Sequence, residues 1–148
     1  MKTSSLTDLK TISEQLPEKI PYLEMLVLFG SRARGDIHAK SDWDFAALYD
    51  EAMRKACVGD TAFRWWEVPR KLGEIVRVSS DNIDVVELNK CSSLIAHFVA
   101  RDGKLLYEKK PGQFEAFREQ ALMKETQLKQ FKKSLREKIE ANLQGWGV

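Results

Sequence analysis

Apolar positions along the chain follow two periods, and together they predict a domain that mixes strands with helices. The apolar run 26–29 predicts a buried strand that stops at Gly30. Further strands are predicted over 42–48 and 83–88, and 105–107 is a short strand or an extended edge. We therefore expect an α/β (α+β) fold with a small mixed β-sheet of three to four strands flanked by helices.

Helical spacing of apolar residues predicts three helices around these strands. The first covers about 6–16 and ends at Pro17, the second runs over about 59–78, and the third covers 94–102. Pro69 is expected to kink the second helix or split it in two, because proline lacks the N–H group that an inner helical turn needs. The residues between the second strand and the second helix are predicted to form a polar crossing.

From Gln113 to about Leu143 the apolar pattern predicts one long helix with a partial heptad seam. Its first half is expected to cover the sheet of its own domain. The distal half is rich in lysine and outruns a domain of this size, so it either meets a partner or forms a solvated tail. We therefore divide the chain into a domain over 1–112 and a C-terminal helix over 113–148, which packs on the domain and can also contact a partner.

Composition and charge suit a single soluble domain. The 148 residues are 43% hydrophobic and 31% charged, the proportions of an ordinary globular protein with one core. The net charge of +2 gives no reason to expect direct nucleic-acid binding. No apolar run approaches the roughly 18 residues of a membrane span, and the N-terminus lacks a signal-peptide pattern, so we expect a cytoplasmic protein. Cys57 and Cys91 lack metal-type spacing and do not suggest a disulfide.

Gly30 and Ser31 stand where the first strand ends and form a candidate phosphate site. Gly30 lets the backbone pass close to a ligand because it has no Cβ. Ser31 is predicted to open a short helical turn, whose unpaired N–H groups, together with the serine hydroxyl, can hold triphosphate oxygens. Arg32 and Arg34 follow at once, and each is either ordinary surface charge or a clamp on the triphosphate.

Acidic residues on the next two predicted strands form a candidate metal site. Asp42 and Asp44 project from the same face of a strand, with Trp43 on the other face. Two carboxylates side by side repel each other, which is explained if they hold Mg²⁺, a cation that prefers oxygen ligands. Asp84 lies in an apolar strand that should be buried, where a carboxylate is costly unless it is paired or binds metal. Glu87 falls on the opposite face and is the weaker candidate.

Aromatic residues outside these motifs leave alternatives open. Trp65 and Trp66 can stack on an adenine base, but packing of at least one of them against the sheet is the better expectation. His38, in the polar loop before Asp42, is expected to be exposed and idle rather than a contact to phosphate or base. His97 is expected to be a packed or capping residue rather than a catalytic base.

The frame of Gly30-Ser31, ten intervening residues and Asp42-x-Asp44 resembles the signature of the DNA polymerase β-type nucleotidyltransferase superfamily. The sequence motif Gly-Ser-Arg-Ala-Arg-Gly … Ser-Asp-Trp-Asp resembles that of its smallest members, the minimal nucleotidyltransferase (MNT) domains. Many of these domains are antitoxins encoded beside a HEPN-domain toxin. The resemblance implies a polymerase β-like palm fold. In that superfamily a third acidic residue on a following strand completes the metal site, and Asp84 is the position that matches it.

The chemistry that this resemblance implies is nucleotidyl transfer with ATP as the substrate. The three aspartates would be the catalytic residues and would hold two Mg²⁺ ions, while the Gly30-Ser31 turn would hold the β and γ phosphates. MNT antitoxins add AMP to a tyrosine of the cognate HEPN ribonuclease toxin and so silence it, which implies a hetero-oligomer. The chain also lacks a basic surface with interleaved aromatics, so a protein acceptor is the most economical one.

Two other functions share parts of this pattern. A transferase acting on a small molecule, such as an aminoglycoside-type antibiotic, has the same core motif but usually carries an added acceptor domain. A non-catalytic antitoxin would neutralise its partner sterically and would not need the aspartates. Resistance in cells without a toxin would favour the first alternative, and full protection by an Asp42→Ala, Asp44→Ala variant would favour the second.

Overall fold

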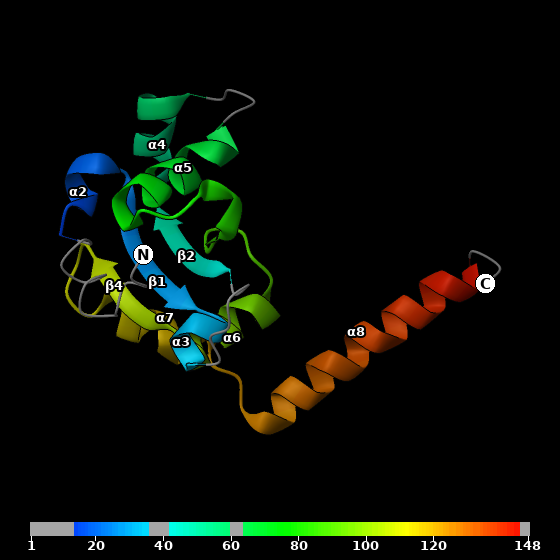
Figure 1. Cartoon of the computed structure of the whole chain (residues 1–148). Coiled ribbons are helices and arrows are strands. Elements are labelled where there is room, and N and C mark those ends of the chain that lie inside the picture. The colour runs from blue at the N-terminus through cyan, green and yellow to red at the C-terminus, as the bar shows by residue number, and fades with distance from the viewer. Residues whose placement is uncertain (1–13, 36–41, 60–63, 146–148) are drawn as a thin grey trace.

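The computed structural model describes residues 14–35, 42–59 and 64–145 of the chain (Figure 1). The strands are β1 (Leu23–Phe29), β2 (Trp43–Tyr49), β3 (Ile83–Glu87) and β4 (Lys104–Glu108). The helices are α2 (Leu16–Lys19), α3 (Ser31–Arg34), α4 (Glu51–Val58), α5 (Arg64–Val76), the 3₁₀ turn η1 (Ser80–Asn82), α6 (Ser93–Asp102), α7 (Gln113–Ala121) and α8 (Glu125–Gly145). The predicted α/β fold class is confirmed.

The four strands form one mixed sheet in the order β3-β2-β1-β4. β1 is antiparallel to β2 and to β4, whereas β2 and β3 run parallel. Asp44 therefore lies opposite Phe29 on one side and opposite Asp84 on the other. This register brings the end of β1 and the starts of β2 and β3 together at one end of the sheet.

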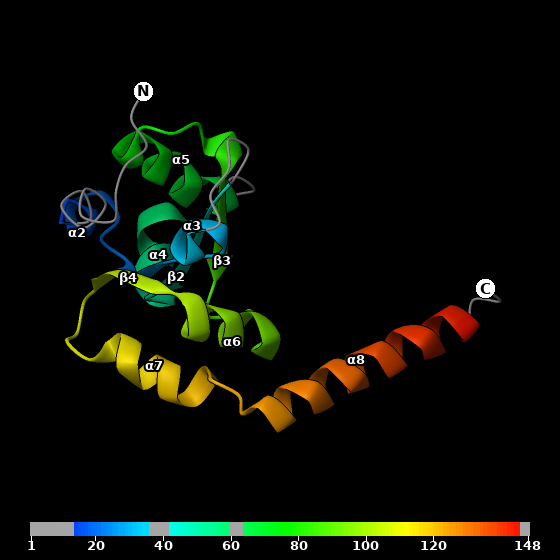
Figure 2. The same ribbon diagram turned by 60° about the horizontal axis from the view of Figure 1, so that its bottom comes forward.

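Helices cover both faces of the sheet, so side chains along a strand alternate between two layers of core (Figure 2). On one face Trp43 and Phe45 pack with Val68 and Leu72 of α5. On the other face Ala46 joins a second cluster to which α6 and α7 contribute. Burying a large apolar side chain contributes about 1.5–3 kcal/mol, so each layer anchors the helices that cover it. Odd-numbered residues of β2 thus face α5, and even-numbered residues face α6.

β3 is an edge strand rather than the buried strand that its apolar sequence predicts. Only Ile83 is buried, Asp84 is exposed, and the remaining residues are half-buried. The prediction of burial is wrong because β3 has a single neighbour among the described strands. One face of an apolar strand can be packed while its outer side stays open.

Helices before β3 also differ from the predicted pattern. α4 occupies the predicted polar crossing, and it begins after Asp50, whose carboxylate accepts a hydrogen bond from the Met53 N–H. α5 continues through Pro69 as one helix, so the predicted split is wrong. Pro17 lies in the first turn of α2, where its missing N–H costs little, and does not end a helix. Most of the helix predicted over 6–16 lies outside the described residues.

The single long helix predicted from Gln113 is in fact two helices, α7 and α8, separated at 122–124. A contact from another helix holds the break: the Met123 N–H donates a hydrogen bond to Nδ1 of His97 on α6, at 3.0 Å. α7 packs on α6 and on the sheet, with Phe114 buried in the second cluster. α8 then projects away from the domain (Figures 1 and 2).

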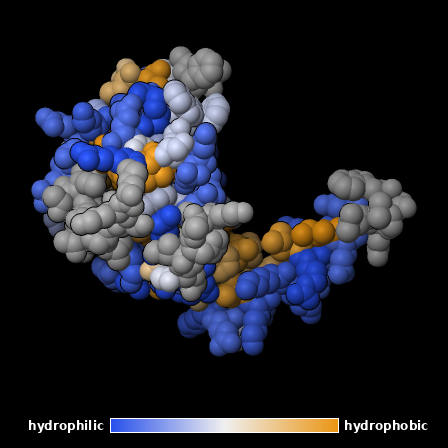
Figure 3. All heavy atoms as spheres, viewed as in Figure 1, coloured by the Kyte–Doolittle hydropathy of each residue, from blue (hydrophilic) through white to orange (hydrophobic). Residues whose placement is uncertain are grey.

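α8 carries an apolar stripe on the side that is turned toward the domain (Figure 3). The side chains of Leu135 and Ile139 in this helix are 42% and 52% exposed. α8 therefore presents apolar surface that its own domain does not cover. Within the described ranges, no helix is both long and apolar enough to cross a membrane.

Candidate functional site

The turn after β1 has a backbone that only glycine fits comfortably. Gly30 has a φ of +74°, in the left-handed region, and its carbonyl accepts a hydrogen bond from the Arg34 N–H at 3.1 Å. A Cβ at this position would overlap the carboxylate of Asp44. The predicted short helix is present as α3, which begins at Ser31. The turn therefore runs directly against the first strand carboxylate, as a phosphate seat beside a metal site would.

The three predicted aspartates meet at the same end of the sheet. Asp44 and Asp84 are register partners on adjacent parallel strands, and Asp42 precedes β2 by one residue. Burial raises the pKa of Asp44, and the charges of Asp84 and Asp42 raise it further, while Arg34 acts to lower it. The site thus gathers like charge that its own residues do not neutralise.

This arrangement fits a cation that brings other ligands with it. Among the described residues no three acidic, histidine or cysteine side chains already converge as a complete metal site. Mg²⁺ does not require one, because it commonly takes one or two carboxylates and draws its other oxygens from phosphates and water. That Asp42, Asp44 and Asp84 are the oxygen donors of such a cation, with nucleotide phosphates at the Gly30 turn completing the set, stays a prediction.

The side chains of Arg32 and Arg34 of α3 contact different parts of the structure. The Arg34 guanidinium lies 3.8 Å from the carboxylate of Asp102 and on the same side as Asp44, whose charge it partly offsets. The Arg32 guanidinium stacks 4.2 Å from the centre of the Trp43 ring, on the opposite side of the strand. Arg34 is therefore the better placed of the two for the triphosphate, and a phosphate contact by either stays a prediction.

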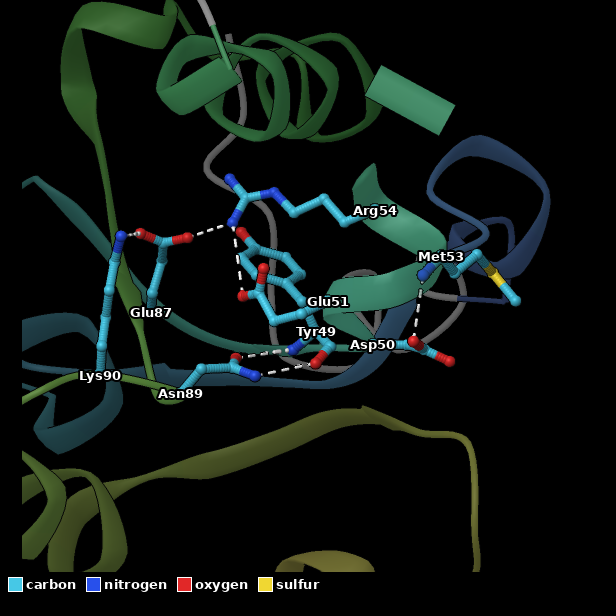
Figure 4. A network of polar contacts seen from close by, with 8 residues as sticks. All are labelled: Tyr49, Asp50, Glu51, Met53, Arg54, Glu87, Asn89 and Lys90. Carbon is cyan, nitrogen blue, oxygen red and sulfur yellow. Dashed lines mark hydrogen bonds and ion pairs between the residues drawn. The ribbon is translucent and has the colours of Figure 1, made fainter. Parts of the chain in front are cut away.

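Glu87, the weaker acidic candidate, belongs to a different network on the α5 face (Figure 4). Its carboxylate is ion-paired with Arg54 of α4 and with Lys90, the latter at 3.0 Å. Burial acts to raise the pKa of Glu87, but hydrogen bonds from Arg54 and Lys90 outweigh it and hold that pKa below its usual range. The Arg54 guanidinium also lies 4.3 Å from the centre of the Tyr49 ring. Glu87 is thus committed to a structural ion pair.

The same network ties the strand ends to the following turn. The side-chain amide of Asn89 donates to the Tyr49 carbonyl and accepts from the Tyr49 N–H, both at 2.9 Å. Arg54 is only 4% exposed although it carries a charge. Sequence reasoning missed this buried arginine because it lies on α4, the helix that was predicted to be a polar crossing.

The two tryptophans of α5 are exposed, so the expectation that at least one packs against the sheet is wrong. Trp65 is 70% exposed and Trp66 is 43% exposed. Both line a cleft of about 450 Å³ between α5 and β3, which we call the α5–β3 cleft. Its other lining residues are Tyr49, Arg54, Pro69, Ser80, Asp81, Ile83, Asp84, Val85 and Glu87. Asp84 contributes to the edge of the cleft from the outer strand, while its register with Asp44 places its side chain on the α6 face.

His97 and the two cysteines, the residues of these types that the structure describes, add no further catalytic candidate. His97 is buried, as expected for a packed residue, and burial with the nearby Arg101 charge holds its pKa below the usual range. Its ring nitrogen Nδ1 caps the break between α7 and α8. His38 lies outside the described residues. Cys57 and Cys91 are both free thiols.

Comparisons with known proteins point to one family. A family model described as "Polymerase beta, Nucleotidyltransferase" matches residues 10–112. The chain is 50% identical over 147 residues to a protein of Aphanizomenon flos-aquae (strain 2012/KM1/D3) named protein adenylyltransferase MntA, with 99% of this chain and 98% of that protein covered.

Solved structures give the same result for the fold. A chain of a crystal structure described as a toxin-antitoxin with AMP-PNP is similar at a TM-score of 0.60 and 25% identity, with 93% of this chain and 98% of that chain covered. A chain from a complex of tri-AMPylated Shewanella oneidensis HEPN toxin with MNT antitoxin is similar at a TM-score of 0.56 and 22% identity, with 93% and 97% covered. The second likeness shows a common fold.

Proposed function

Since the chain belongs to the polymerase β nucleotidyltransferase family, we propose that it is a Mg²⁺-dependent protein adenylyltransferase that acts as an antitoxin. It transfers AMP from ATP to a tyrosine hydroxyl of a cognate HEPN ribonuclease toxin and thereby neutralises the toxin. The observation that carries the proposal is the pairing of Asp44 with Asp84 on adjacent strands, against the turn at Gly30. The 50% identity to a protein adenylyltransferase supports a protein as the acceptor.

In this proposal some residues of the site bind the metal ions and others position the phosphates of ATP. Asp42, Asp44 and Asp84 would hold two Mg²⁺ ions, and Gly30 and Ser31 would seat the β and γ phosphates of ATP. When bound, the metal ions neutralise phosphate charge and favour an in-line displacement. Arg34 and Arg32 lie on either side of the seat, where a guanidinium can orient the triphosphate.

The transfer itself needs little covalent help from the protein. The oxygen of the tyrosine hydroxyl forms a bond to the α phosphorus of ATP, and the bond from that phosphorus to the bridging oxygen of the β phosphate breaks. Pyrophosphate leaves toward the Gly30 turn. The hydroxyl proton passes to the carboxylate of Asp84, which stands on the strand farthest from that turn. The products are an AMP-tyrosine phosphodiester and pyrophosphate.

The toxin also needs a surface on which to dock, and α8 provides one. Its apolar residues Leu128, Phe131, Leu135 and Ile139 fall at helical spacing, and of these Leu135 and Ile139 are exposed while the other two are half-buried. Figure 3 shows the apolar stripe along this helix. The two structural relatives described above are toxin-antitoxin complexes, so a hetero-oligomer in which the toxin covers this stripe fits the proposal. We propose that the reaction takes place in the cytoplasm, where ATP is available.

A docking role for α8 predicts a specific loss of affinity. Replacing Leu135 and Ile139 by aspartate should weaken the antitoxin–toxin complex by at least about tenfold, because a charge would be buried at the apolar contact. Calorimetry of the complex gives the dissociation constant, and Lys133→Asp on the same helix is the control for the added charge. Unchanged affinity would show that the toxin docks elsewhere.

The proposed reaction is tested directly by label transfer. The purified chain is incubated with Mg²⁺, ATP labelled at the α phosphate, and the HEPN protein encoded in the neighbouring reading frame. We expect label on a toxin tyrosine, identified by mass spectrometry, and loss of the toxin's ribonuclease activity. Absence of label on the toxin would refute the enzymatic proposal, while label from γ-labelled ATP would indicate phosphorylation instead.

A further inference from the structure

The α5–β3 cleft is built unlike an ordinary surface depression. Trp65 and Trp66 stand on its α5 wall with 70% and 43% of their surface exposed. Exposed tryptophan is costly for a free domain and common at the centre of binding surfaces, because it offers a large rigid contact area. The helix that carries the two rings is anchored by the buried Val68 and Leu72, so the rings are held in place and are not part of the core.

The position of the cleft follows from the order of strands at the reactive end of the sheet. The phosphate seat at Gly30 ends β1, Asp44 stands on β2, Asp84 stands on β3, and the cleft lies beside β3. In an in-line displacement the attacking oxygen and the leaving pyrophosphate lie on opposite sides of the phosphorus. If pyrophosphate leaves toward β1, the nucleophile must arrive from the side of β3.

We infer that the α5–β3 cleft binds the segment of the acceptor protein that carries the acceptor tyrosine, with Trp65 and Trp66 as its main contacts. The inference rests on the proposed function and adds the surface that selects the acceptor. The segment lies against the two indole rings, passes around the edge strand β3 and presents its hydroxyl to Asp84 on the α6 face of the sheet. Trp65 and Trp66 are therefore specificity residues for the acceptor, not catalytic residues.

Charge along the cleft favours a basic neighbour of the acceptor tyrosine. Asp81 lines the cleft together with the two indole faces, and an arginine or lysine of the acceptor can contact both kinds of group. The Arg54 charge at the cleft is already paired with Glu87, so the floor of the cleft does not repel such a residue. A short acceptor segment with one basic and one tyrosine side chain fits the lining.

The adenine base of ATP is the other possible occupant of an aromatic surface. The two assignments differ in which substrate loses affinity when the rings are removed. Trp65→Ala with Trp66→Ala should raise KM for the toxin by about 30-fold, the usual effect of losing a central interface tryptophan. KM for ATP and the affinity for ATP with Mg²⁺ in the absence of toxin should change by less than twofold.

Controls separate the role of the cleft from general damage. Trp65→Phe with Trp66→Phe should recover most of the toxin affinity, because the aromatic faces are retained. Glu74→Ala, an exposed position on α5 outside the cleft lining, should leave both KM values unchanged. Hydrogen exchange of the wild-type complex should show protection of the first turns of α5 and of β3 upon toxin binding.

Each outcome decides between assignments. A rise in KM for ATP, or equal KM for the toxin in the alanine and wild-type proteins, overturns the acceptor assignment while wild-type label transfer still supports the adenylyltransferase. No label transfer by the wild-type protein overturns the proposed function itself. Absence of protection at α5 and β3 in the wild-type complex overturns the cleft assignment even if the alanine variant proves unstable.

Discussion

Two charged clusters share the strands β2 and β3, and they are built on opposite principles. At the start of the strands, on the face of α6, Asp42, Asp44 and Asp84 place like charges together, and burial together with this repulsion raises the pKa of Asp44. At the other end, on the face of α5, Glu87 is matched by Arg54 and Lys90, and its pKa is lowered (Figure 4). We propose that a bound cation completes the first cluster, whereas the charges of the second are balanced by its own residues.

The two clusters show that the presence of a cationic partner helps to assign a role to an acidic residue on a strand. Asp84 and Glu87 are three positions apart on β3, so they point to opposite faces. We expect the carboxylate that already has a cationic partner to stabilise the fold, and the one that neighbours other carboxylates to need a bound cation. Charge balance, not acidity alone, separates the structural residue from the candidate site residue.

The largest effect is expected from removing the unbalanced cluster. Asp42→Ala with Asp44→Ala should lower AMP transfer to the toxin by about a thousandfold or more, because the metal that supports the displacement is lost. Both side chains are at least partly exposed, so the fold should persist. Initial rates of label transfer measure the effect, and Glu119→Ala on the exposed face of α7 is the control. Full toxin neutralisation by the aspartate variant in cells would instead mean that docking alone suffices.

Breaking the balanced cluster should damage stability. Glu87→Ala leaves the buried Arg54 without its main partner and should lower the free energy of unfolding by about 2 kcal/mol. Urea unfolding followed by tryptophan fluorescence measures this, and Glu74→Ala, which removes an exposed pair with Arg70, should cost less than about 0.5 kcal/mol. Equal losses in the two variants would remove the distinction between the clusters.

As the pH falls, the aspartate cluster should take up protons before the ion-paired cluster around Glu87 does. Because the pKa of Asp44 is raised, its carboxylate takes up a proton at a higher pH than an ordinary aspartate, and Mg²⁺ competes with that proton. Once the pH is below that pKa, the apparent affinity for Mg²⁺ should fall by up to about tenfold per pH unit. Calorimetric titration with Mg²⁺ and ATP across the acidic range tests this. In Asp84→Asn the loss should begin at lower pH, since one repelling charge is gone.

The smallest effect is a gain of stability without ligand. Ionised Asp44 is disfavoured in the folded state, so it opposes folding above its folded pKa and ceases to do so as the pH falls through that value. At neutral pH Asp44→Asn should therefore raise the Tm of the metal-free protein by a few degrees. Differential scanning calorimetry with and without Mg²⁺ and ATP checks the change. The variant should also gain less from the ligands than the wild type does, and a lower Tm would contradict the repulsion described here.

Local motifs made the candidate site predictable. The strand that stops at Gly30 and the alternation around Trp43 are short-range patterns, and the acidic exception within the third strand singled out Asp84. The structure brings these residues together through the register of β2 and β3. The roles of the three aspartates and of the Gly30-Ser31 turn as ligands stay predictions that the experiments above address.

Features fixed by distant contacts were not predictable in this way. The chain has neither glycine nor proline at 122–124, yet the helix breaks there, where the Met123 N–H bonds to His97, 26 residues earlier. The exposure of Trp65 and Trp66 likewise depends on how α5 lies across the sheet, which the helical period does not reveal. α4 carried a local signal, the N-cap at Asp50, but its largely polar surface concealed it.

The hydrogen bond between His97 and Met123 lies at the break between α7 and α8, the point from which α8 projects. α8 has 21 residues, so its far end lies about 30 Å from the break. A rotation of only about 10° at this break would carry that tip through roughly 5 Å, more than the width of a side-chain contact. The direction of α8, and with it the position of the apolar stripe proposed to contact a toxin, therefore depends on the backbone at 122–124, where the Met123 N–H bonds to His97.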